Sequence, residues 1–488
     1  MDAWKVRGLV SRSVCVHAPS RATLAALTAA LAALVLASPS QAAEVGVVGD
    51  VTWGQPRADI DREIELLRGA GVRWLRANVN WAGLEPDRKG DVNEWLLAEY
   101  DYAIDRAHEA GLQVLMPIAD GVPYWASADP AKHVDGGGTP RWEATYRPQR
   151  MSDYGDFVRF VVSHFAPKGV HTYMIWNEPN HPRFWPSGPD ASAYVPMLRA
   201  GYVAAKAASP DATVLLGGLS KSDFAYLEAV YRAGGGDYFD AVAVQPYTYG
   251  VDPTDSWNGV HDWEDPDRIS SNAFPAIQEV RQSMVAFGDA DKDVWLTEFG
   301  YSTTTQDGGV PAATQAAFLV KAYRYVERFP WVKALFWYAA RNSPFYDDRD
   351  EYEARFGLAT TSWSLKQSYW ALRAYALKLP ATGRVLLRKG TQHSIAWGSA
   401  RVTLRGRVAL SKGAAWRVAA AARSARRTVV VQRRTPRGWV VVARVRTSLA
   451  GAFRVRVIAR GSTVRYRAVA RYEGLRVRSR VVRVTVSR

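Results

Sequence analysis

The sequence predicts an α/β fold: a (β/α)8 TIM barrel followed by a small all-β, immunoglobulin-like sandwich. Three observations support this. Between residues 44 and 380, short apolar runs alternate with longer amphipathic stretches, as in a parallel sheet with helical crossovers. The composition, 48% hydrophobic and 23% charged over 488 residues, is that of a globular chain. The sign of the net charge also changes near residue 380, which indicates a domain boundary.

Residues 1–43 are typical of a signal peptide. Basic residues precede an apolar run at 22–37, and Ser40 and Ala42 offer small side chains for cleavage. The run is shorter than the roughly 20 residues of a membrane span, so cleavage is favoured over retention as an anchor. Cys15 is the single cysteine, so a mature chain would have no thiol and no disulfide. We therefore expect a secreted, extracellular protein, either free or associated with the cell wall.

Residues 44–380 supply the elements of the barrel. The expected strands are 45–50, 72–79, 113–118, 172–176, 213–217, 241–245, 294–297 and 334–338. The expected helices are 60–70, 96–110, 154–165, 191–208, 225–233, 274–287, 312–329 and 366–377. Eight strand-helix units over roughly 340 residues match a (β/α)8 barrel with a few long loops.

Two glutamates stand where such a barrel carries its chemistry, at the carboxyl ends of strands. The fourth strand is followed by Asn177-Glu178-Pro179, and the seventh by Glu298. Facing carboxylates about 5 to 5.5 Å apart cleave glycosidic bonds with retention: one attacks the anomeric carbon and the other protonates the leaving oxygen. The competing interpretation of Asn177-Glu178-Pro179 is a helix-start turn, and Glu298 alone would be a weak signal.

This pair of motifs resembles the retaining glycoside hydrolases of clan A, notably the cellulase-type family 5 and family 39 enzymes. The resemblance covers about 44–380. It implies that Glu178 is the acid/base, that Glu298 is the nucleophile, and that Asn177 hydrogen-bonds the sugar 2-hydroxyl. An arginine and a phenol beside Glu298 would stabilise its anion, whereas burial beside Trp176 would favour a protonated Glu178.

Three further residues match the clan. Arg76 corresponds to the arginine near the nucleophile, Tyr247 to the tyrosine that hydrogen-bonds it, and Trp337 to the aromatic platform under the cleaved sugar. Each also has a structural interpretation: an ion-pair partner, a packing residue and a core residue, respectively. Gln245 departs from the pattern, since many members have histidine there, and this leaves the subfamily and the sugar contacts open.

Aromatic residues in the expected loops could stack on sugar rings or fill the core, and the sequence does not decide between these. Trp125 and Trp185 are taken as substrate-binding candidates, beside Trp53, Trp81, Tyr124, Trp257 and Trp263. Their number favours an extended cleft and a poly- or oligosaccharide substrate. The eight histidines are scattered and no Gly-rich phosphate loop follows a strand, so we expect no metal and no cofactor.

The tail is strongly basic. Residues 381–488 contain 27 Lys and Arg against the single acid Glu473, a net charge of +26, and the rest of the chain carries −10. Alternating apolar and basic residues predict roughly seven short strands. The charge could tether the protein to an anionic cell-surface polymer, or it could be an arginine-rich solvated face. No feature indicates an obligate protein partner.

The sequence therefore predicts a barrel at 44–380 and a basic sandwich at 381–488, with a secreted retaining β-glycoside hydrolase as the leading function. The alternative is a non-catalytic carbohydrate-binding or cell-wall-associated protein on the same scaffold. Both glutamates are present, which favours the enzyme. The sugar, the linkage and the mode of cleavage are not determined by these residues.

Overall fold

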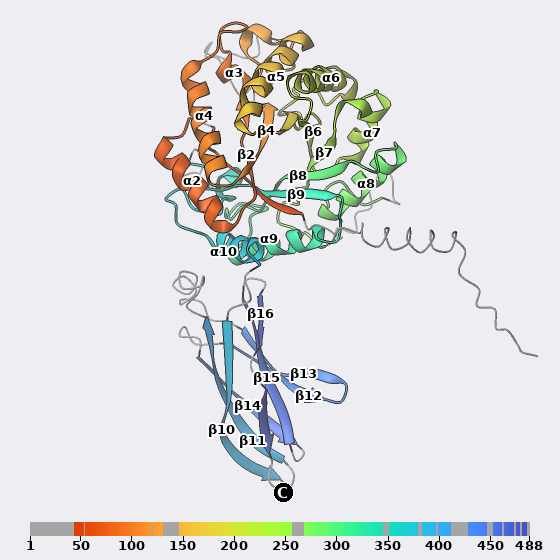
Figure 1. Ribbon diagram of the computed structural model, residues 1–488. Coiled ribbons are helices and arrows are strands. Elements are labelled where there is room, and N and C mark those ends of the chain that lie inside the picture. The colour runs from red at the N-terminus through yellow and green to blue at the C-terminus, as the bar shows by residue number, and fades with distance from the viewer. Residues whose placement is uncertain are drawn as a thin grey trace, which may run out of the picture. The chain divides into compact units, whose positions relative to one another are not determined.

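A computed structural model describes residues 43–52, 54–119, 121–129, 146–255, 268–344, 351–378, 383–396, 399–410, 428–446, 452–460, 463–472, 475–478 and 481–485. The signal peptide expected at 1–43 lies outside them, apart from Ala43. Two kinds of architecture follow one another along the chain, a parallel barrel with helices and an antiparallel β domain (Figure 1).

The barrel is closed, as the sequence predicts. β1 pairs with both β2 and β9, β2 also pairs with β4, and every pairing around the ring is parallel. The second expected strand, 72–79, is interrupted at residues 77 and 78 and forms two short strands. The strands are β1 (Glu44–Val48), β2 (Trp74–Arg76), β3 (Val79–Asn80), β4 (Gln113–Ala119), β5 (Thr172–Asn177), β6 (Thr213–Ser220), β7 (Ala241–Gln245), β8 (Asp293–Phe299) and β9 (Val332–Trp337).

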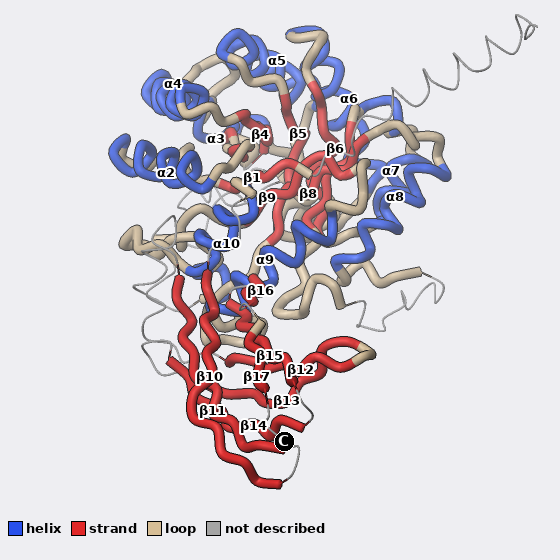
Figure 2. Tube along the Cα trace, turned by 60° about the horizontal axis from the view of Figure 1, so that its bottom comes forward, coloured by secondary structure: helices blue, strands red, loops and turns tan. Residues whose placement is uncertain are grey.

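Amphipathic helices surround the strands (Figure 2). Expected helix 274–287 begins with the 3-10 turn η5, and Pro275 stands at its start, where a backbone N–H has no partner within a helix. The α-helices are α2 (Arg57–Ala70), α3 (Trp81–Leu84), α4 (Glu94–Glu109), α5 (Met151–Phe165), α6 (Ala191–Ala208), α7 (Phe224–Arg232), α8 (Ile277–Ala286), α9 (Ala312–Val326) and α10 (Gln367–Ala376). The 3-10 helices are η1 (Tyr124–Ala126), η3 (Ala166–Lys168), η4 (Gly236–Tyr238), η5 (Phe274–Ala276) and η7 (Tyr352–Arg355).

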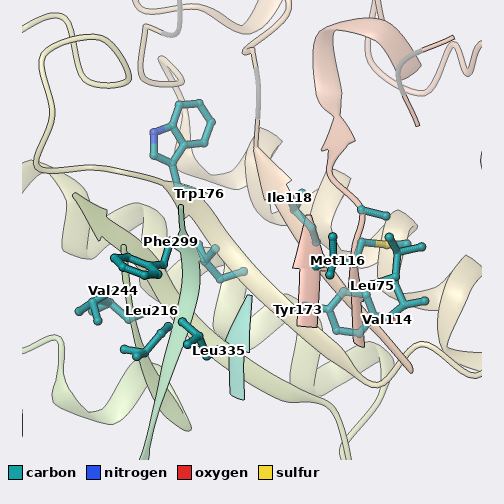
Figure 3. Close-up of a cluster of buried hydrophobic side chains, with 14 of the residues drawn as sticks. Leu75, Val114, Met116, Ile118, Tyr173, Trp176, Leu216, Val244, Phe299 and Leu335 are labelled. Carbon is teal, nitrogen blue, oxygen red and sulfur yellow. The ribbon is translucent and has the colours of Figure 1, made fainter. Parts of the chain in front are cut away.

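Alternation along the strands divides the barrel into two apolar layers. One cluster includes Trp74, Met174, Trp295 and Phe336. Gly46 is required there, because a Cβ on it would lie 2.5 Å from the Phe336 ring. The other cluster packs the strands against the helices and includes the side chains drawn in Figure 3. Two filled layers make the barrel a rigid frame for the groups at its strand ends.

The C-terminal β domain has two antiparallel sheets. One has the order β10-β11-β14, and the other β13-β12-β15-β16 with β17 beside β15. Buried residues from both sheets, among them Leu404, Val429, Phe453 and Tyr466, form one apolar cluster, which makes the domain a sandwich. The strands are β10 (Gly383–Ala396), β11 (Ser399–Leu410), β12 (Thr428–Thr435), β13 (Gly438–Arg446), β14 (Ala452–Arg460), β15 (Thr463–Tyr472), β16 (Leu475–Arg478) and β17 (Val482–Thr485).

Within the part of the chain that the structure describes, no helix combines the length and the apolar character needed to cross a bilayer.

Candidate active site

A cavity of about 360 Å³ opens at the carboxyl ends of the barrel strands. Its wall contains the sequence-predicted residues Arg76, Asn177, Glu178, Tyr247 and Glu298, which come from four parts of the chain. The described residues of the wall also include Asp50, Asn78, His181, Arg183, Phe184, Ser220, Lys221, Tyr249, Tyr338, Arg341, Tyr352, Glu353 and Phe356.

The backbone after β5 turns two consecutive side chains into this cavity. In a regular strand neighbouring side chains point to opposite faces, yet Asn177 and Glu178 both contribute to the wall. Trp176 and Glu178 have positive φ values of 74° and 43°, which non-glycine residues rarely adopt. The Glu178 N–H donates to the Gly218 carbonyl at 2.9 Å, which fixes this bend to β6. Such strain is typical of functional sites.

Glu298 accepts hydrogen bonds on both carboxylate oxygens. Arg76 forms an ion pair with Oε1, and Gln245 Nε2 donates to the same oxygen at 3.0 Å. The Tyr247 hydroxyl donates to Oε2 at 2.9 Å. Arg76 is 1% exposed, so this pair is largely removed from water. Three donors, one of them cationic, therefore meet the two carboxylate oxygens of Glu298.

Asn177 is oriented by the same donors. Its Oδ1 accepts from Arg76 Nη2 at 3.0 Å and from Gln245 Nε2 at 2.8 Å. With that oxygen occupied, the amide NH2 is the group left to meet a ligand in the cavity. Gly218 makes room for Gln245, because a Cβ on it would approach the Gln245 Nε2 to 2.9 Å. Gln245, which stands in place of the expected histidine, thus links Asn177 to Glu298.

Glu178 is in the opposite environment. It is 9% exposed, and burial together with the negative charge of Glu298 raises its pKa to about 8. A hydrogen bond from Ser220 and the charge of Arg76 oppose this shift without cancelling it. The carboxyl is therefore mostly protonated at neutral pH, and can donate a proton. Two identical side chains thus share one cavity in different surroundings, Glu298 among three hydrogen-bond donors and Glu178 buried with a raised pKa.

A second acidic group lies at the end of β1. Burial raises the pKa of Asp50 on the cavity wall and of Glu63 on α2, and the Asp50 N–H donates to Glu63 Oε1 at 2.9 Å. Arg341, beyond β9, is 5% exposed, pairs with Asp59 at 3.3 Å and lies over the Trp363 ring at 4.4 Å. Its positive charge partly offsets both raised pKa values.

Glu353, on η7, adds a fourth carboxyl to the cavity wall, beside Asp50, Glu178 and Glu298. Desolvation raises its pKa, the charge of Arg183 opposes that shift, and the charge of Glu298 adds to it. Near it, the Tyr249 and Tyr352 rings stack with centroids 5.9 Å apart. These groups offer hydrogen-bond acceptors and aromatic faces, which are the features that recognise sugar rings. Over the described residues, no cluster of three or more His, Cys, Asp or Glu could hold a metal ion.

Comparison with protein families decides the affiliation. The model of the cellulase family, glycosyl hydrolase family 5, matches residues 38–340. The chain belongs to glycosyl hydrolase family 5. It is accordingly a glycosidase.

Solved structures with the same fold include two family 39 enzymes and a mannosidase. The chain is 18% identical to a family 39 glycoside hydrolase from the gut symbiont Bacteroides cellulosilyticus WH2, with a TM-score of 0.53 over 86% of this chain and 81% of that one. It is 17% identical to a family 39 β-xylosidase from Caulobacter crescentus, with a TM-score of 0.51, covering 81% and 82%. The exo-β-1,4-mannosidase Op5Man5 from Opitutaceae bacterium strain TAV5 is 17% identical, with a TM-score of 0.51, covering 70% and 60%.

A curated plant protein also matches part of the chain. It is the chloroplastic β-glucosidase-like SFR2 of Oryza sativa subsp. japonica, 31% identical over 134 residues. The match covers 26% of this chain and only 18% of that protein.

The structure corrects the expected aromatic platform of this family 5 chain. Trp337 is 1% exposed, donates from Nε1 to the Phe356 carbonyl at 3.2 Å and packs against Phe299 in the outer layer. The next residue, Tyr338, lines the cavity. Because side chains alternate along a strand, a shift of one residue moves the aromatic ring from the core to the cavity.

Two other expected binding residues also lie away from the cavity wall. Trp185 is 1% exposed and packs edge-on against Trp176 and Tyr194. Trp125 is half-buried and donates to the Glu85 carbonyl at 2.8 Å. Both indoles therefore pack against neighbouring residues, which agrees with the alternative interpretation of these tryptophans as core residues. Of the further candidates, Trp81 is buried, Tyr124 is exposed away from the wall, and Trp53, Trp257 and Trp263 lie outside the described residues.

Sequence reasoning missed several wall residues. Asp50 is the last residue of the expected strand 45–50, so attention to polar residues at strand ends could have found it. Tyr249, Glu353 and Arg341 stand in loops without periodicity, and no pattern there signals which side chain turns inward.

Proposed function

We propose that this family 5 glycosidase is a secreted retaining enzyme that cleaves β-glycosidic bonds in a poly- or oligosaccharide by double displacement. Glu298 is the nucleophile and Glu178 is the acid/base. Membership of the family favours this over the non-catalytic alternative. The observation that carries the proposal is the contrast between the two carboxyls, one with three donors and one buried with a pKa of about 8.

In the first step, Glu298 attacks the anomeric carbon while Glu178 gives its proton to the leaving oxygen. The glycosidic bond breaks, a bond forms between the sugar and Glu298, and Glu178 becomes a carboxylate. In the second step that carboxylate takes a proton from water, and the resulting hydroxide displaces Glu298 from the anomeric carbon. Two inversions retain the configuration. The Asn177 amide NH2, oriented by Arg76 and Gln245, suits hydrogen bonding to a sugar hydroxyl in both steps.

The roles can be separated with two variants. Glu298→Ala should abolish turnover, with partial rescue by azide, which forms a glycosyl azide of inverted configuration. Glu178→Ala should keep the first step for aryl glycosides with good leaving groups, and azide should then give the retained product. Glu65→Ala, an exposed glutamate on α2, is the matched control and should be fully active. Equal losses in the Glu178 and Glu298 variants, with no azide product from either, would contradict the assignment.

The sugar is best found with a panel. The names of the similar proteins refer to β-xylosidase, β-mannosidase and β-glucosidase-like activities, so aryl β-xylosides, β-mannosides and β-glucosides come first. Release of reducing ends from xylans, mannans and β-glucans tests polymers. Secretion is examined separately, by N-terminal sequencing of protein recovered from the culture medium; a start near residue 44 is expected.

A further inference from the structure

The basic tail arranges its arginines in rows across strands. In the β10-β11-β14 sheet, Arg388 lies opposite Arg405, and Arg405 lies opposite Arg454. In the other sheet, Arg465 of β15 lies opposite Arg483 of β17. Residues directly opposite in antiparallel strands are about 5 Å apart, and like charges there destabilise a sheet. This strand register therefore places positive charges side by side, which adds electrostatic repulsion to the folded sheet.

The described side chains in these rows face solvent. On β14, Phe453 and Val457 are buried in the sandwich, whereas Arg454 of the first row is exposed, as is Arg456, which lies opposite Thr403. Arg465 and Arg483 are likewise exposed, next to the buried Val464 and Val484. The pleat thus turns apolar residues inward and guanidinium groups outward on both sheets.

The part of the domain that the structure describes contains no acidic residue that could neutralise the arginine rows. Residues 381–488 include one acid, Glu473, which lies outside the described residues. Arginine carries a planar fork of donors that binds carboxylates in pairs of hydrogen bonds, so a row of arginines fits a series of carboxylates. Neighbouring arginines of a row are about 5 Å apart across the strands, and alternate residues along one strand are about 7 Å apart. Together these positions form an extended surface that suits a linear polymer.

We propose that the outward faces of this sandwich, marked by Arg454, Arg456, Arg465 and Arg483, bind an anionic polysaccharide with regularly spaced carboxylates. The partner is a saccharide because the same chain is a glycosidase, and a domain that holds a sugar polymer keeps the enzyme near its substrate. For the outward face of β14 a membrane is disfavoured, because the exposed residues that the structure describes on this strand are Arg454, Arg456 and Ile458. The proposal does not depend on the roles of Glu178 and Glu298.

Binding is measured on the full chain carrying Glu298→Ala, so that turnover does not consume the polymer, and on the unmodified chain for comparison. Polygalacturonate is the anionic probe and an uncharged β-glucan of similar length is the neutral one. We expect binding to polygalacturonate alone, weakened about tenfold or more between 50 and 500 mM salt. Phosphatidylglycerol vesicles and duplex DNA are run beside them, and tighter binding to either overturns the proposal.

Arg454→Glu should weaken polygalacturonate binding about tenfold or more, because it removes one cation and adds a repelling charge. The same position lies opposite Arg405, so the variant should melt no lower than the unmodified chain, which separates lost binding from lost folding. The controls change net charge equally elsewhere: Arg437→Glu in the β12–β13 turn and Arg159→Glu on α5, both exposed.

The controls should lose less than twofold, a difference that ordinary surface charges produce. Arg454→Gln serves as the second variant and should lose a smaller, still measurable part of the affinity. Losses in the controls equal to those of Arg454→Glu, salt-independent binding, or equal binding of the neutral glucan would each overturn the proposal.

Discussion

Arg76 and Glu298 are 222 residues apart in sequence and form an ion pair at the centre of the cavity. The same guanidinium donates to Asn177 Oδ1 at 3.0 Å, so one side chain from β2 holds groups from β5 and β8 together. Removal of either partner from such a buried pair leaves an unpaired charge, which is costly. The site therefore depends on the closed ring of strands, because no local segment contains more than one of these residues.

Glu178 should govern the alkaline limb of the activity profile. Its pKa of about 8 means that the donating form is present below that pH and falls tenfold per pH unit above it. A plot of log(kcat/KM) against pH should thus turn down near pH 8. Glu353→Gln removes a negative charge that helps to raise this pKa, so its limb should move to lower pH.

A value of kcat/KM that stays constant up to pH 10 would contradict this assignment. So would a residual activity of Glu178→Gln that falls at alkaline pH in the same way as that of the unmodified enzyme. An aryl glycoside with a very good leaving group is the useful comparison, because its departure needs little protonation. Its glycosylation rate should keep most of its value above pH 8.

Gly218 should be sensitive to a single methyl group. A Cβ there would lie 2.8 Å from Thr297 Oγ1 and 2.9 Å from Gln245 Nε2, so Gly218→Ala must displace the amide that links Asn177 and Glu298. Displacement of a positioning group by about 1 Å can cost on the order of a hundredfold in rate. We expect kcat/KM to fall by roughly that factor.

The matched control is Gly236→Ala on η4, whose Cβ would meet only the Tyr231 ring at 3.1 Å, far from the cavity wall. It should retain activity within twofold. If both variants lost activity in parallel with their melting temperatures, the effect would be on folding and not on Gln245.

The sequence predicts the barrel well because its apolar runs have the right length and order. Glu178 is identified because its motif is local. The aromatic platform is harder to predict, because Phe336, Trp337 and Tyr338 are three consecutive aromatic residues. The sequence does not show which of the three side chains faces the cavity, and the family pattern places the platform at Trp337, one residue before Tyr338. Loop residues such as Glu353 have no periodicity to read. The role of Gln245 depends on contacts with β5 and β8, which lie 68 and 53 residues away.

Trp337 and Tyr338 should give opposite phenotypes. Trp337→Phe leaves the Phe356 carbonyl without its indole donor and opens space in the core, so the free energy of unfolding should fall by about 1–3 kcal/mol. Its KM should stay within twofold. Tyr338→Leu removes an aromatic face from the cavity wall and should raise KM about tenfold, which corresponds to about 1.4 kcal/mol.

Denaturant unfolding and steady-state kinetics on both variants measure this contrast. A larger KM effect from Trp337→Phe than from Tyr338→Leu would restore the original assignment of Trp337 to the platform.

Glu63 should make the enzyme less stable as pH rises. Its side chain is 2% exposed, and burial followed by the charge of Asp50 raises its pKa to about 8, against 4.5 as the ordinary value. The folded state then holds a proton that the unfolded state has lost between about pH 4.5 and 8. In that window the free energy of unfolding falls as pH rises, by up to about 1.4 kcal/mol per pH unit.

Glu63→Gln removes this titration while its amide oxygen can still accept the Asp50 N–H. Below pH 5 the variant and the unmodified enzyme should have similar stability, whereas at pH 8 to 9 the variant should be more stable. Glu178 titrates in both proteins and cancels in the comparison, so the difference between the two curves reports Glu63 together with its interaction with Asp50. The control, Glu65→Gln, lies on the same helix with its side chain 49% exposed, and its curve should run parallel to that of the unmodified enzyme. Parallel curves for Glu63→Gln as well would mean that Glu63 is already ionised in the folded state, with Arg341 rather than a proton balancing its charge.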